Sequence, residues 1–186
     1  MILHVHCSFS VAVLPPDEDA QPFKNNSAYT NAIASLSIEL ANQVSCITKK
    51  PVPQTWFNIS RNLYFPFDNV SQIHLEYENF DPSKQINTFS LFMYIVLLEH
   101  TIIKQADVVL LGFPLMWPMS DQIRRNDLLA YAPLTRDDGP AMTWSMHGIG
   151  YLELDDFDSA EKYFRHSYEI YVRKSFNVSS FFLTSI

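Results

Sequence analysis

The chain has 186 residues, of which 47% are hydrophobic and 14% are aromatic, so it can bury the core of one domain and is not disordered. A net charge of -7 leaves no basic stripe to neutralise phosphates, which excludes a nucleic-acid-binding protein. With only four glycines, a glycine-rich phosphate loop and a dinucleotide fingerprint are excluded as well. We therefore expect an all-α fold rather than an α/β fold.

The cysteines and histidines give no sign of a metal centre. Cys7 and Cys46 are the only cysteines, and the six histidines have no metal-binding spacing, so we expect no metal, no other cofactor and no disulfide framework. Residues 1–13 lack the basic start and cleavage site of a signal peptide, which favours a cytoplasmic location. The longest apolar run, Leu91 to Leu98, is shorter than the ~20 residues of a membrane span.

An acidic, proline-stiffened turn at residues 15–19 runs into an amide-rich segment at residues 25–31. Such a turn can hold the polar groups of a site at the start of a helix. It can also be a solvated turn whose charges cap that helix. The residues alone leave both interpretations open.

Two helices are predicted to follow. Ser27 or Thr30 can cap the first, which has apolar residues at helical spacing and ends before the Lys49-Lys50-Pro51 break. The second covers residues 53–64. Residues 67–83 show no sustained period and are predicted to be a long connection of the kind that lines sites, although a solvated loop explains His74 and Glu76 more simply.

Residues 103–112 place a charge and an amide, Lys104 and Gln105, at the start of an apolar helix. Such groups need partners when they are buried, and either sugar hydroxyls or a salt bridge from Lys104 to Asp107 would supply them. A helix is predicted from Ser120 to Leu129, with its two arginines on a solvated face.

The last two predicted helices form an αα-hairpin. The first opens at residue 141 and carries Trp144, which suits either the stacking of a pyranose ring or an ordinary core position. The second is amphipathic, with one apolar stripe of Phe157, Ala160, Phe164, Tyr168 and Tyr171. A tetratricopeptide-like interaction module is therefore an alternative to an enzyme, although no second repeat occurs.

Three segments, Pro15 to Asn31, Ile103 to Gly112 and Gly139 to Ser145, resemble glycoside hydrolase family sixty-five, the acid-trehalase-like group, and occur in the family's order. The resemblance implies part of an (α/α)₆ barrel of helical hairpins over residues 13–175. Residues 1–12 do not match, residues 84–100 look like an insertion, and residues 176–186 form a divergent tail.

The resemblance also implies an inverting glycosidase whose carbohydrate substrate contains an α-glucosyl bond, as in a trehalose-like disaccharide or glucosyl-galactosyl-hydroxylysine. Glu18 matches the catalytic proton donor. The matching substrate-binding residues are Lys104, Gln105, Asn26, Asn31 and Trp144. No acid occurs after Lys174, where the family continues towards its general base, so we expect the chain to be inactive alone.

Overall fold

The computed structural model describes residues 24–82, 103, 106–136, 141–169, 171 and 172. Within these ranges the chain is mainly helical, as expected, and the predicted insertion and tail lie outside them. None of the described helices has the length and hydropathy needed to cross a membrane. The elements are α1 (Ala28–Thr48), α2 (Gln54–Asn62), β1 (Phe67–Asp68), β2 (Ile73–His74), η2 (Asp107–Leu111), α3 (Asp121–Tyr131), η3 (Ala132–Leu134), α4 (Ala141–Glu153) and α5 (Phe157–Glu169), where η denotes a 3-10 helix.

The ends of α1 confirm the predicted boundaries. The hydroxyl of Ser27 accepts a hydrogen bond from the amide of Thr30 at 3.3 Å, and so satisfies one of the free N–H groups of the first turn. Lys49, with φ of 56°, ends the helix in the left-handed conformation. Ser120 caps α3 in the same way, through the amide of Ile123.

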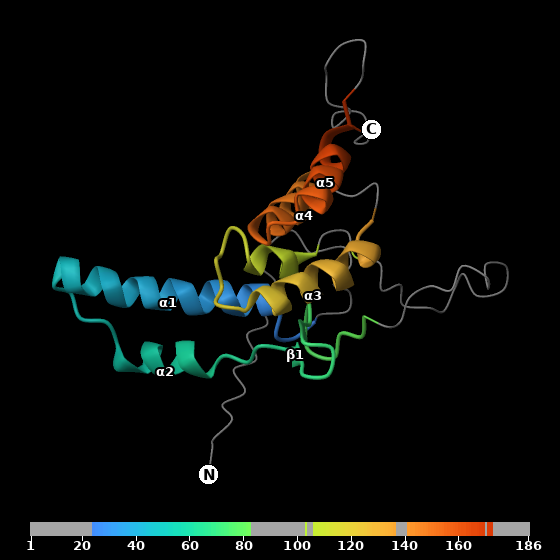
Figure 1. The fold of residues 1–186 in the computed structure, drawn as a ribbon. Coiled ribbons are helices and arrows are strands. Elements are labelled where there is room, and N and C mark those ends of the chain that lie inside the picture. Colours follow the sequence, from blue (N-terminus) through green and yellow to red (C-terminus); the bar gives the residue numbers. More distant parts are fainter. Residues whose placement is uncertain (1–23, 83–102, 104–105, 137–140, 170, 173–186) are drawn as a thin grey trace, which may run out of the picture.

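The helices from the two ends of the described chain lie apart. Figure 1 shows α1 and α2 side by side on one flank and the α4–α5 hairpin on the opposite flank. Between them, η2 contacts α1, α3 and α4. The predicted αα-hairpin is therefore confirmed, and η2 lies at the centre of the described structure.

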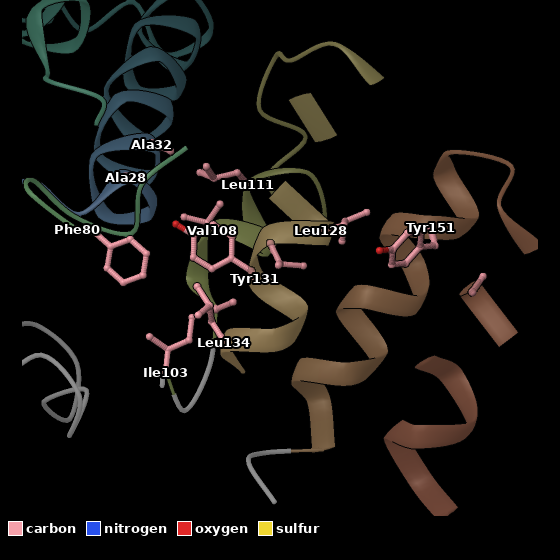
Figure 2. Close-up of a cluster of buried hydrophobic side chains, with 13 residues drawn as sticks. Ala28, Ala32, Phe80, Ile103, Val108, Leu111, Leu128, Tyr131, Leu134 and Tyr151 are labelled. Atoms are coloured by element: carbon pink, nitrogen blue, oxygen red, sulfur yellow. The ribbon is translucent and has the colours of Figure 1, made fainter. Parts of the chain in front are cut away.

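Figure 2 shows the main core cluster, where side chains of α1, η2, α3 and α4 meet around Val108, Tyr131 and Leu134. The helix α5 contributes Ala160 to this cluster, and its Tyr163 packs against the cluster while partly exposed. Phe157 and Phe164 are instead 64% and 61% exposed, so the described elements cover only part of the apolar stripe of α5. Helical spacing identifies the apolar face of a helix, but it does not say whether a neighbouring element covers that face.

The prediction of a loop at residues 67–83 needs a correction, because β1 and β2 form a short antiparallel pair there. The carboxylate of Asp68 accepts hydrogen bonds from the amides of Val70 and Ser71 and holds the turn between the strands. Bonds to Ser71 and Val70 lower the pKa of Asp68. A two-residue strand is too short to show an alternating pattern in the sequence.

Candidate functional site

The candidate site is built on the first turn of α1, which is held by the segment after β2. The amide of Ala28 donates to the carbonyl oxygen of Glu76 at 3.1 Å, and the amide of Glu78 donates to that of Asn25 at 3.0 Å. Asn26, with φ of 55°, donates from its side-chain nitrogen to Glu78 Oε2 at 2.8 Å. An amide and a carboxylate, both suited to sugar hydroxyls, therefore stand together at the helix start.

Asn31 lies one helical turn further along and has a different setting. Its side chain is 6% exposed, and its Nδ2 donates to the carbonyl oxygen of Tyr64 at 2.7 Å. This bond ties α1 to the connection between α2 and β1. The amide nitrogen of Asn31 thus has a protein partner, and its predicted contact with substrate stays a prediction.

Glu76 connects this turn to the central helix η2. Its carboxylate is buried and accepts hydrogen bonds from the amides of Asp107, at 2.9 Å, and Val108, at 3.3 Å. Amides in the first turn of a helix have no partner within the helix, so the carboxylate acts as a cap. The expectation that His74 and Glu76 lie in a solvated loop is wrong, since both side chains are buried.

His74 is held in turn by α3. Asp127 accepts from the backbone amide of His74 at 2.8 Å, and its second oxygen lies 2.8 Å from Nδ1 of the same residue. The hydroxyl of Tyr131 donates to the carbonyl oxygen of His74 at 2.8 Å. Burial raises the pKa of Asp127 although the bonds to His74 oppose it, and burial raises the pKa of Tyr131 well above its ordinary value.

The two arginines of α3 were expected on a solvated face, and the structure contradicts this. Arg124 is buried and donates to the carbonyl oxygen of Val109 at 2.6 Å and to Glu153 at 3.1 Å. Arg125 pairs with Asp156 at 3.3 Å. A helical period alone did not reveal that η2 and α4 both contact α3 and supply the partners of Arg124.

Trp144 lies away from this turn, in the α4–α5 hairpin. It is 3% exposed and stacks on Tyr163, with ring centroids 5.7 Å apart. It lines a cavity of about 610 Å³ together with Tyr151, Tyr163 and the C-terminal half of α5. One face of the indole is thus covered by protein, and its predicted role in stacking a sugar stays a prediction.

The other three predicted site residues, Glu18, Lys104 and Gln105, lie outside the described residues. The residues on either side of Lys104 and Gln105 are fixed by hydrogen bonds. Ile103 pairs with the chain after α3, since its amide donates to Leu134 and its carbonyl accepts from Arg136. On the other side, Glu76 caps the helix that begins at Asp107.

Sequence reasoning missed the two carboxylates that organise this turn. In the sequence Glu76 and Glu78 alternate with apolar and aromatic residues, and that spacing was the available signal, although the structure places the two residues in a bend and a turn rather than in a strand. Asp127 gave no such signal, because a polar residue within a helix is ordinarily solvated.

Comparison with known proteins agrees with this architecture. The sequence model of the glycosyl hydrolase family 65 central catalytic domain matches residues 7–180. A putative kojibiose phosphorylase from the human microbiome superposes with a TM-score of 0.61 at 18% identity, over 83% of this chain and 25% of that one. The all-α fold of this chain is therefore part of an (α/α)₆ barrel.

Curated relatives are more similar in sequence. Protein-glucosylgalactosylhydroxylysine glucosidase of Gallus gallus is 42% identical over 83% of this chain and 20% of its own length. The protein of that name from Danio rerio is 39% identical over 90% and 23%. A cell wall acid trehalase of Arthroderma benhamiae is 32% identical over 87% and 14%. The chain spans about a fifth of the glucosidases it matches, and it belongs to glycosyl hydrolase family 65.

Proposed function

We propose that this chain carries part of the substrate site of a glycosidase that cleaves an α-glucosyl bond, with Glu18 as the proton donor. One observation carries the proposal. The segments next to Asn26 and next to the Lys104–Gln105 pair meet at one place, where residues 25–28, 76–78 and 106–108 are joined by hydrogen bonds. The relatives' names, a glucosidase of glucosylgalactosylhydroxylysine and acid trehalases, support an α-glucosyl substrate.

In this site the protein has two tasks. Asn26, Asn31, Lys104 and Gln105 bind hydroxyl groups of the sugar, whereas Trp144 packs on a ring in the separate cavity of the α4–α5 hairpin. Glu18 protonates the leaving oxygen, which requires a carboxyl group that remains protonated near neutral pH. Asp17 and Asp19 flank it, and their negative charges oppose its ionisation.

Hydrolysis with inversion needs a second carboxylate that activates water about 6.5–9.5 Å from the acid. The twelve residues after Lys174 contain no aspartate or glutamate. We therefore propose that the chain binds an α-glucosyl disaccharide but does not hydrolyse it without the rest of a family 65 domain.

The experiment is a titration of the full chain with trehalose, kojibiose and cellobiose, followed by NMR, together with an assay of glucose release. We expect binding of the α-linked sugars, weaker binding of β-linked cellobiose, and no release of glucose. Lys104→Met should weaken binding, whereas Asp155→Asn, in the turn before α5, should not. Equal binding of all three sugars, or glucose release that persists in Glu18→Gln, would contradict the proposal.

A second candidate function is supported by the exposed face of α5. Phe157 and Phe164 stand a heptad apart on this helix, and both are more than half exposed. Two large apolar side chains on one helical stripe can pack against a helix of a second protein molecule, such as another copy of this chain. We propose the interaction module as the alternative that applies if the chain binds no sugar.

A further inference from the structure

Glu76 makes hydrogen bonds to the starts of two helices, one through its backbone and two through its side chain. Its backbone carbonyl accepts from Ala28 in the first turn of α1, at 3.1 Å. Its carboxylate accepts from Asp107 and Val108 in the first turn of η2, at 2.9 and 3.3 Å. One residue thus joins the starts of two helices that are distant in sequence.

The polar groups around these two turns belong to one cluster. Asn26 and Glu78 are bonded to each other at the start of α1. The charge of Asp107, at the start of η2, acts with burial to raise the pKa of Tyr29 in α1. The relative position of the two turns therefore decides where this cluster presents its hydrogen-bonding groups.

The carboxylate is suited to this task because it is an acceptor at both oxygens. Two helix-start amides point at it, and a negative charge there is favourable. A glutamine of the same size would offer one oxygen and one N–H₂ group, which cannot accept. One of the two amides would then be buried without a partner, and the start of η2 would be released.

We infer that Glu76 is a positioning residue that fixes the first turn of η2 against the first turn of α1, and so holds Asn26 and Glu78 in place for a sugar. The inference rests on the proposed function only in naming the sugar as the ligand. That Glu76 joins the two turns follows from its hydrogen bonds alone.

The test compares Glu76→Gln with Asp156→Asn in the full chain labelled with ¹⁵N. Asp156 is a matched control, because its carboxylate also caps a helix, through the amide of Ser159 at 3.2 Å in α5. In Glu76→Gln we expect the amide of Asp107 or Val108 to exchange about tenfold faster, as for one lost hydrogen bond, with Ser159 unchanged. Asp156→Asn should leave all three amides unchanged, because only one oxygen of Asp156 accepts from Ser159 and the oxygen of asparagine can do the same.

Two further readouts separate positioning from general stability. The pKa of Tyr29, followed by NMR of its ring carbon, should fall towards its ordinary value in Glu76→Gln, because Asp107 moves away. The affinity for trehalose should fall about tenfold in Glu76→Gln and stay unchanged in Asp156→Asn.

The outcomes are distinguishable. Unchanged amide exchange and an unchanged pKa of Tyr29 would overturn the inference. Faster exchange with unchanged affinity for trehalose would also overturn it, because the turns would be released without effect on the site. If the wild-type chain binds no sugar, the proposed function fails, and amide exchange with the Tyr29 titration still decides whether Glu76 joins the turns.

Discussion

Asp127 and His74 are joined twice, through the backbone amide and through the imidazole ring, each at 2.8 Å. The carboxylate is fully buried, so it has no water to replace these partners. This pair ties α3 to the end of β2, two residues before the Glu76 cap. The stability of the candidate site therefore depends on a carboxylate that lies in a different helix.

Asp127→Ala should lower the free energy of unfolding by about 3–5 kcal/mol, because it leaves the amide and the ring of His74 buried without their acceptor. Urea unfolding followed by circular dichroism measures this. Asp121→Ala in the same helix is the control, since Asp121 is exposed and should cost less than ~1 kcal/mol. Equal losses for the two variants would contradict the role of the buried pair.

The buried side chain of His147 should make the free energy of unfolding depend on pH. Its side chain is fully buried, neither ring nitrogen has a hydrogen-bond partner among the described residues, and burial lowers its pKa from 6.5 to about 4. Between these two values the unfolded chain binds more protons than the folded chain, so stability falls as pH decreases from about 6.5 to 4. Lowering the pH through this range reduces the free energy of unfolding by about 3 kcal/mol, and above pH 6.5 there is no such loss.

His147→Leu removes this titration and the two unpartnered nitrogens at nearly constant volume. We expect a chain that is more stable than the wild type at pH 5, with a flatter dependence of unfolding free energy on pH between 4 and 6.5. Thr143→Val is the control, because it removes another buried, unpartnered polar atom without a titratable group. A pH dependence that persists in His147→Leu would show that another group causes it.

Gly112 is predicted to tolerate no side chain. A Cβ atom there would lie 1.9 Å from Cζ of Arg124, whose guanidinium is buried and bonded to Val109 and Glu153. Gly112→Ala should therefore cost about 2–4 kcal/mol instead of giving the usual gain of a helical Gly→Ala change. Thermal unfolding of Gly112→Ala, Arg124→Met and the double variant tests this, because the clash requires strong non-additivity between the two sites. Additive effects would exclude the clash.

The helical part of the fold could be predicted from the sequence because its signals are local. Ser27 and Ser120 mark helix starts that the structure confirms, and the turn at residues 154–156 separates α4 from α5 as expected. The candidate site depended on partners remote in sequence. Glu76 lies 31 residues from Asp107, and His74 lies 53 residues from Asp127. A single sequence has no periodicity at such separations, so neither carboxylate could be assigned its partner.

The exposed stripe of α5 gives the last prediction. Phe157 and Phe164 are mostly solvent-exposed, so their replacement by serine should change the free energy of unfolding by less than ~1 kcal/mol. If the stripe is a contact surface, the double variant should shift the chain towards monomer in sedimentation velocity at micromolar concentration. Tyr163→Ser is the control, because Tyr163 is stacked between Trp144 and Tyr151 and its loss should destabilise the hairpin.

A double variant that unfolds would show that the stripe belongs to the core. A folded double variant that still binds trehalose would show that the α5 surface is separate from the sugar site.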